Sequence, residues 1–252
     1  MYLSRLELDL NKRETMRALF SPARFHGAVE SAFPSEQTQR QPSILAADNP
    51  LSLFDNGTSY VERSRKLWRL DTVRGKTYLL LLSEVRPDLR SADEQFGTGH
   101  GGETIDYAPF LDSIHAGDIL RFRLTANPTV SKAKARGTDG IKPRGEVKSF
   151  MVKPEDHKGW LQNLKTWLAR KAERNGFQLT DNDFNIVESR WRQFRKGVNR
   201  KQSVKFLSVT YEGILEVTNE EAFRLALVRG IGREKAYGMG LLTVMRTGAR
   251  HG

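Results

Sequence analysis

The order in which strand-like and helix-like patterns alternate is the feature that most constrains the fold of this chain. Residues 2–9 alternate apolar and polar side chains as a strand does, and SPARFHGAVESAF (21–33) follows with a good N-cap, Ser21, and Pro22 at the first helical position. Two strands are predicted at 67–71 and 76–85, then a weak helix, then a strand at 118–128. This βαββαβ order is that of a ferredoxin-like domain.

The second half repeats this order less regularly. Residues 129–150 are basic and rich in Gly and Thr, and we expect a linker with a mobile loop there. A helix ending at Gly176, two long strands at 184–196 and 203–218, a helix with a capping box from Thr218 to Glu221, and a closing strand at 241–245 follow. We therefore expect an α+β chain with an N-terminal ferredoxin-like domain (1–128), a basic linker or loop (129–150) and a C-terminal ferredoxin-like domain (151–252).

Composition narrows the class of partner. The 252 residues carry a formal net charge of +11, which favours an anionic partner such as nucleic acid. Cysteine is absent and the five histidines have no zinc-site spacing, so we expect neither metal nor cofactor. The longest apolar run, residues 78–82, is far too short to span a bilayer, and the first residues do not have the pattern of a signal peptide. We expect a cytoplasmic protein without membrane contact.

Four glycines gather in GIGREKAYGMGLL (230–242). A dinucleotide fingerprint requires glycine at the position of Lys235, the Gly-Lys-Ser/Thr of a P-loop is missing, and both motifs precede a helix, whereas here a helix precedes the glycines. One interpretation is a loop whose bare backbone approaches a phosphate chain, with Arg233 and Lys235 beside it. The other is a helix-to-strand turn that requires positive φ angles.

A basic segment lies between residues 190 and 205 and holds no acidic residue. Trp191 and Phe194 alternate with its arginines, and RKGVNRK (195–201) predicts a basic turn between two long strands. We expect this segment to bind phosphates, the alternative being a solvated basic hairpin. Its basic residues are Arg190, Arg192, Arg195, Lys196, Arg200, Lys201 and Lys205.

His26 is the histidine best placed for chemistry. On the helical wheel it falls at the edge of an apolar stripe that contains Phe25, Val29 and Phe33, so its side chain is expected to be half exposed. Such a position suits a group that transfers protons, and it also suits an ordinary boundary histidine.

Taken in order, MYLSRLELD, the histidine of the first helix, LRFRLTANP, YEGILEV and GIGREKAYGMGLL resemble the CasE family, the CRISPR repeat endoribonucleases of type I-E systems. The resemblance spans nearly the whole chain. It implies two tandem ferredoxin-like (RRM-like) domains with a glycine-rich loop before the last strand. It also implies metal-independent cleavage of a CRISPR repeat hairpin by attack of a ribose 2′-OH, and retention of the guide RNA within a Cascade antiviral complex.

The same resemblance implies roles for particular residues. His26 matches the family's catalytic histidine, and Lys205 matches a basic residue kept close to the scissile phosphate. Some relatives carry a tyrosine one turn before the histidine, where this chain has Ala23; Glu30, one turn after it, is either a group that orients His26 or a solvated charge. The expected RNA-binding residues are Arg190, Arg192, Arg195, Lys196, Arg200, Lys201, Gly230, Gly232, Arg233, Lys235, Gly238 and Gly240.

Two other functions fit parts of the sequence. A non-catalytic subunit that binds an RNA hairpin would need the basic segment and the glycines but not His26, and Ala23 mildly favours it. A basic scaffold for acidic proteins would need only the net charge, and its binding would depend weakly on salt, unlike binding to RNA.

Overall fold

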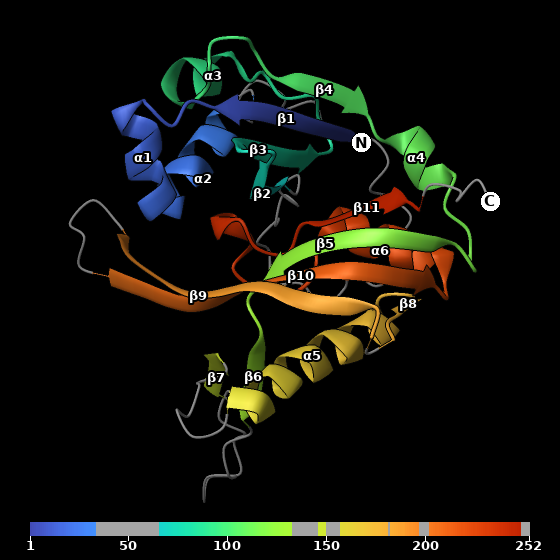
Figure 1. Cartoon of the computed structure of the whole chain (residues 1–252). Helices are drawn as coiled ribbons and strands as arrows, with labels where there is room; N and C mark the ends of the chain where they lie inside the picture. Colours follow the sequence, from blue (N-terminus) through green and yellow to red (C-terminus); the bar gives the residue numbers. More distant parts are fainter. Residues whose placement is uncertain (34–65, 133–145, 150–156, 181, 197–201, 248–252) are drawn as a thin grey trace, which may run out of the picture.

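The first of three antiparallel sheets among the residues that the structure describes contains β1 (Tyr2–Leu8), β2 (Lys66–Val73), β3 (Lys76–Ser83) and β4 (Glu103–Asp106), in the order β2-β3-β1-β4 (Figure 1). Helices α1 (Arg13–Phe20), α2 (Pro22–Ser31) and α3 (Arg90–Phe96) pack on one face through a core that includes Leu6, Phe25, Trp68, Leu79 and Phe96. The computed structural model describes residues 1–33, 66–132, 146–149, 157–180, 182–196 and 202–247. The β1-α2-β2-β3-α3-β4 order with this strand arrangement is a ferredoxin-like unit.

The second sheet has the order β11-β5-β10-β8, and β9 also pairs with β10. Its strands are β5 (Ile119–Ala126), β8 (Phe177–Gln178), β9 (Phe184–Lys196), β10 (Gln202–Val217) and β11 (Leu242–Arg246). The apolar residues of β5, at alternate positions such as Leu120 and Leu124, bury against α5 (His157–Arg174) and α6 (Glu220–Arg229). β5-α5-β9-β10-α6-β11 is therefore a second ferredoxin-like unit.

The predicted boundary at residue 128 requires a correction. The strand expected to close the first unit is β5, and it pairs with β10 and β11 of the second sheet. The first sheet is closed instead by β4, which pairs with β1 and was not predicted as a strand. The reason is that β4 is only four residues long and three of its four side chains are exposed, so it carries no apolar alternation. By strand pairing, the units divide after α4 (Ala108–Asp112).

Smaller differences concern helix ends and the predicted linker. Helix α1 was not predicted, and the N-cap of α6 is Asn219, whose side chain accepts a hydrogen bond from the Ala222 amide, rather than Thr218. The ends of the predicted linker form two paired strands, β6 (Thr129–Lys132) and β7 (Glu146–Ser149). Residues 133–145 and 150 lie outside the described residues.

The two units share one hydrophobic core. Leu67 and Leu82, on the helix-free face of the first sheet, belong to the same buried cluster as Leu124, Leu241 and Leu242 of the second unit. Figure 1 shows β11 running between the first sheet and β5. The units therefore meet through side chains that are fully removed from water, which makes their relative placement part of the folded state.

Candidate active site

His26 lies on α2 with its side chain 39% exposed, as its position on the helical wheel predicts. The ring centroid of Tyr237 lies 6.5 Å away, edge-on to the imidazole. Tyr237 belongs to the short 3-10 helix η3 (Lys235–Tyr237) of the glycine-rich loop. Two regions more than 200 residues apart, identified independently from sequence, are thus neighbours in the structure.

An aromatic cluster supports this contact. Tyr237 packs with Phe194, Phe206 and Met239, and Ala23 packs against the same cluster. The ring centroids of Phe194 and Tyr237 are 4.9 Å apart at 69°, an edge-to-face arrangement. The position one turn before His26 is therefore occupied by a methyl group that packs against the cluster containing Tyr237. Tyr237 is the residue of the site that sequence reasoning missed, although an aromatic residue between two glycine pairs was a visible signal.

Glu30 is shared between two partners. Its Oε2 accepts a hydrogen bond from Lys66 Nζ at 2.7 Å, while its Oε1 lies 3.8 Å from His26 Nδ1. At 3.8 Å the second contact is an ion pair only when His26 is protonated and is too long for a direct hydrogen bond. Glu30 is thus neither a free surface charge nor a direct hydrogen-bond partner of His26 in this geometry.

A narrow crevice between the units adjoins the aromatic cluster. Its walls include Leu19 and Pro22 from the first unit and Arg190, Arg192 and Gly238 from the second. Three predicted RNA-binding residues are therefore brought to one place beside the His26 helix.

The two arginines of the crevice differ. Arg190 is half exposed and pairs with Glu188 at 3.0 Å. Arg192 donates to the Leu19 carbonyl at 3.3 Å, and its Nε has no hydrogen-bond partner in the protein. Burial, with the neighbouring Arg190 adding to it, lowers the pKa of Arg192 to about 10, so this guanidinium is charged at neutral pH but poorly solvated. A desolvated cation with an open donor is a favourable partner for an anion.

The glycine-rich loop wraps around β2, the edge strand of the first sheet. A Cβ on Gly230 would lie 2.9 Å from a Leu67 methyl, and a Cβ on Gly238 would lie 2.8 Å from the Trp68 ring. A Cβ on Gly240 would lie 2.8 Å from the Ile231 carbonyl oxygen, and all four glycines have φ between +70° and +89°. Positive φ and close protein contacts thus explain these glycines without a phosphate. Of the loop's basic residues, Arg233 is exposed and Lys235 Nζ donates to the Arg229 carbonyl at 2.6 Å.

Lys205 is not brought to His26. It lies opposite Gln193 on the face of the second sheet that also carries Leu207, which is buried in the core with α5. Phe206, the next residue, points to the other face and joins the cluster beside Tyr237. The Lys205 ammonium lies 5.1 Å from the centroid of the Trp191 ring, a cation–π contact on the exposed hairpin.

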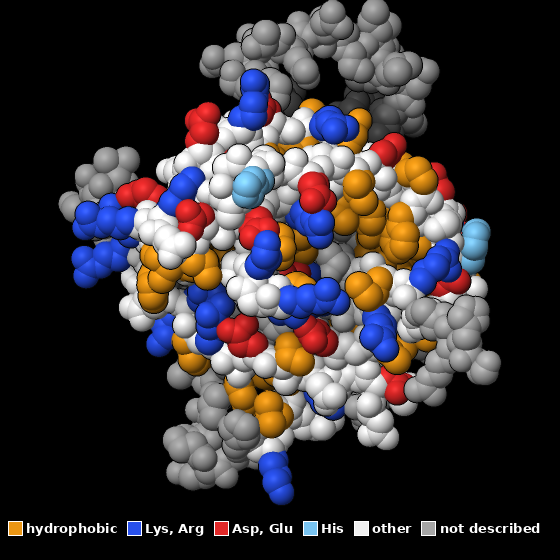
Figure 2. All heavy atoms as spheres, turned by 45° about the horizontal axis from the view of Figure 1, so that its top comes forward, with side chains coloured by type: hydrophobic (Ala, Val, Ile, Leu, Met, Phe, Trp, Pro, Cys, Tyr) orange, Lys and Arg blue, Asp and Glu red, His pale blue; other side chains and the backbone are white. Residues whose placement is uncertain are grey.

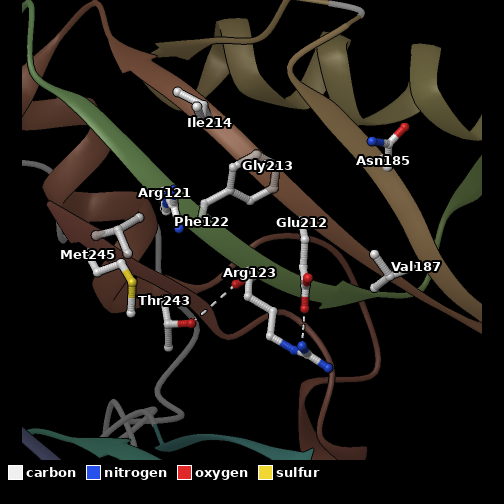
Figure 3. Close-up of a pocket in the computed structure, with 11 residues that line it drawn as sticks. Arg121, Phe122, Arg123, Asn185, Val187, Glu212, Gly213, Ile214, Thr243 and Met245 are labelled. Carbon is white, nitrogen blue, oxygen red and sulfur yellow. Dashed lines mark hydrogen bonds and ion pairs between the residues drawn. The ribbon is translucent and has the colours of Figure 1, made fainter. Parts of the chain in front are cut away.

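The remaining predicted RNA-binding residues of the basic segment are only partly described. Arg195 is exposed, Lys196 ends β9, and Arg200 and Lys201 lie outside the described residues. On the face of the molecule shown in Figure 2, basic and acidic side chains are interspersed, so the net charge forms no single basic field there. A larger hollow on the open half of the second sheet, lined by Arg121, Glu212, Ile214 and Met245 among others (Figure 3), includes no predicted site residue.

The described residues contain no group of three or more His, Asp or Glu side chains that would hold a metal ion. Within the same residues, every helix is too short or too polar to cross a bilayer.

The paired ferredoxin-like units, with a glycine-rich loop set against a histidine-bearing helix, define a protein of the tandem ferredoxin-like class. Within that class, the chain belongs to the family described as CRISPR associated protein, whose model matches residues 1–246. The predicted resemblance to the CasE branch is confirmed.

Known relatives are similar to this chain over almost its full length. The chain is 26% identical over 253 residues to the CRISPR-associated endoribonuclease Cse3 of Thermus thermophilus, covering 97% of this chain and 99% of the relative. A structure of CRISPR endoribonuclease Cse3 bound to a 19-nucleotide RNA matches with a TM-score of 0.67 at 25% identity, over 97% of this chain and 100% of that one. Thermus thermophilus Cse3 bound to an RNA that represents a pre-cleavage complex matches with a TM-score of 0.65 at 25% identity, over 97% and 98%.

Proposed function

We propose that this protein is a metal-independent endoribonuclease that cleaves CRISPR precursor RNA at repeat hairpins and remains bound to the guide RNA it produces. The observation that carries the proposal is the half-exposed His26 held edge-on to Tyr237, beside a crevice that contains Arg190 and Arg192. The family, and relatives named as endoribonucleases with RNA bound, support it.

The chemistry follows from the groups in place. The ribose 2′-oxygen attacks the adjacent phosphorus, and its proton leaves to a base. The bond from phosphorus to the 5′-oxygen breaks, and that oxygen takes up a proton, which gives a 2′,3′-cyclic phosphate and a 5′-OH. His26, exposed on one side and walled by Tyr237 on the other, is proposed to move one of these protons. A well-placed acid or base contributes about 10²–10⁴ in rate.

The RNA is proposed to lie along the hairpin and across the crevice. Arg192 would supply a poorly solvated charge beside the cleavage point, and Arg190 a solvated one. Contacts to the stem phosphates are proposed for Arg195, Lys196, Arg200, Lys201 and Arg233, with Lys235 and the glycine-rich loop as further contacts. A-form stems expose shape and phosphates more than base edges, so we expect most of the affinity to come from these charges.

Lys205 is proposed to bind the RNA backbone from the outer face of the hairpin. The resemblance puts it at the scissile phosphate, but its position across the sheet from Phe206 and Tyr237 favours a contact with the stem. For Lys205 to act in catalysis, the scissile phosphate would have to reach past the edge of the hairpin to the face of the sheet that carries Lys205.

Partners and location follow from the same proposal. A protein that keeps the guide RNA after cleavage would enter a type I-E Cascade complex through that RNA, and the step would take place in the cytoplasm, where the precursor RNA is made.

A second candidate function, hairpin binding without cleavage, is favoured by one observation: Ala23 offers no proton where some relatives have tyrosine.

The deciding experiment is a cleavage assay in EDTA with a hairpin repeat RNA from the same host. Wild type is expected to cut the all-ribose RNA but not an RNA with a 2′-deoxy nucleotide at the cut site. His26→Ala is expected to bind with unchanged affinity and to lose at least about 10²-fold in rate. His115→Ala is the matched control, because His115 is also exposed and also lies beside a glutamate, Glu220, at 3.2 Å. Tight binding by wild type without cleavage would leave the binding-only function.

A further inference from the structure

A buried guanidinium crosses from the first unit to the second. Arg69 of β2 is 2% exposed and forms a bidentate pair with Asp71 on its own strand, at 2.7 and 2.6 Å. Its remaining donors reach three acceptors of the second unit: the Arg123 carbonyl at 2.8 Å, the Leu241 carbonyl at 2.7 Å and Thr243 Oγ1 at 2.7 Å. One side chain therefore joins β2 to β5 and to β11 at once.

The surroundings fix this arginine in place. Asp71 is 7% exposed, and Arg123 Nε lies 3.2 Å from its Oδ1, so the carboxylate is balanced by two guanidinium groups. Arg123 also pairs with Glu212 at the edge of the hollow in Figure 3, where Thr243 is seen donating to the Arg123 carbonyl. Charge pairs held in fixed bidentate geometry have little freedom to shift.

The acceptors connect the arginine to the glycine-rich loop. Leu241 directly follows Gly240, whose amide donates to the Thr125 carbonyl at 2.7 Å and whose carbonyl accepts from Ile231 at 2.9 Å. Arg69 thus holds the point at which the loop becomes β11. Leu67 and Trp68, the two residues before it, make the close approaches to Gly230 and Gly238.

The same strand also contacts the histidine helix. Trp68 packs on Phe25, the neighbour of His26, with ring centroids 5.9 Å apart. Leu67, Trp68 and Arg69 of β2 therefore all contact the glycine-rich loop or its end, and Trp68 also contacts the helix that carries His26. The distance between the side chains of His26 and Tyr237 therefore depends on how the glycine-rich loop is held against β2.

We propose that Arg69 is a positioning residue, which fixes the glycine-rich loop against β2 and so sets the placement of Tyr237 and the crevice relative to His26. This rests on the proposed function for its effect on cleavage, but its effect on the loop does not require cleavage. A displacement of about 1 Å at reacting groups costs about 10²-fold in rate, so a loosened loop is expected to slow cleavage more than it weakens binding.

The test compares Arg69→Met with Leu79→Ala, which removes a buried side chain from the core of the first unit and leaves the arginine contacts in place. Thr243→Val is a milder variant that deletes one acceptor while keeping the side chain's size. All are measured at a temperature where each is fully folded. The readouts are amide hydrogen exchange at Gly240 and Ile231, single-turnover cleavage, and affinity for the 2′-deoxy RNA.

Arg69→Met is expected to speed exchange at the two amides by at least about tenfold and to slow cleavage about 100-fold. Affinity for the 2′-deoxy RNA is expected to stay within about threefold. Thr243→Val should show a smaller change in the same direction, and Leu79→Ala should leave the two amides unchanged. Arg69→Lys is expected to recover only part of the rate, because an ammonium cannot reach all four partners.

Unchanged exchange in Arg69→Met would overturn the positioning role, and so would equal losses of rate and affinity. Loss of loop protection in Leu79→Ala to the same extent would overturn it as well, because the effect would then be general destabilisation. Absence of cleavage by the wild type would overturn the proposed function alone, and the exchange data would still decide whether Arg69 holds the loop.

Discussion

At the scale of single residues, the site depends on side chains whose importance the sequence shows unevenly. His26 was predictable, because its place at the edge of an apolar stripe follows from helical spacing. The four glycines were predictable as unusual, but their purpose was not: a count of glycines does not distinguish approach to a phosphate from approach to Leu67 and Trp68. Only the fold shows which atoms come close.

Tyr237 is the residue for which packing gives the clearest expectation. Tyr237→Phe keeps the ring against Phe194 and His26. We therefore expect the free energy of unfolding to change little and the cleavage rate to stay within about threefold of wild type. Tyr237→Ala leaves a cavity in the aromatic cluster, which is expected to cost about 3–5 kcal/mol and to slow cleavage by at least about tenfold. Urea unfolding and single-turnover cleavage measure the two effects. A rate for Tyr237→Phe as low as that of Tyr237→Ala would show that the hydroxyl, rather than the ring, serves the reaction.

At the scale of elements, the β9–β10 hairpin presents different chemistry on its two faces. The face toward the first unit carries Phe206 and Arg192, and the opposite face carries Lys205 and Trp191 above the helical core. Because successive residues of a strand point to opposite faces, alternation alone separates Arg192 from Trp191. It did not reveal which face would meet the histidine helix, because that depends on how the two units pack.

Lys205 provides a test of this two-faced hairpin. Lys205→Ala is expected to lower the slope of log affinity against log salt by about one, because one phosphate contact is lost. At saturating RNA, cleavage is expected to stay within about threefold of wild type. Lys165→Ala, which removes a lysine packed over Phe184 away from the crevice, is the control. A loss of 100-fold or more at saturating RNA would return Lys205 to the scissile phosphate.

The edge strands show why element order alone misplaced the boundary between the units. β5 has clear alternation, so the sequence predicts it as a strand, but an alternating pattern does not show which strands it pairs with. β4 pairs with β1 over four residues whose sequence, ETID, has no pattern to detect. The ferredoxin-like order was therefore predicted with the wrong strand closing the first unit.

At the scale of the whole molecule, the shared core makes the two units one cooperative body. We expect calorimetry of the full chain to show a single unfolding transition. Leu67→Ala, at the junction, is expected to lower stability by about 2–5 kcal/mol and to shift that one transition as a whole. Leu6→Ala, in the core of the first unit, serves as the control for a non-junction site. Two resolved transitions, of which Leu67→Ala moves only one, would show that the units unfold separately.

The junction also has a consequence for how the chain is made. Arg69 and the Leu241 carbonyl it binds are 172 residues apart, so at about 5–20 residues per second the ribosome needs roughly 9–34 seconds to synthesise the chain between them. During that interval the nascent first unit holds a charged pair that lacks its partners from β5 and β11. We therefore expect this edge of β2 to stay hydrated in the nascent chain until the glycine-rich segment emerges from the ribosome. The catalytic surface is expected to form only after that segment has been synthesised.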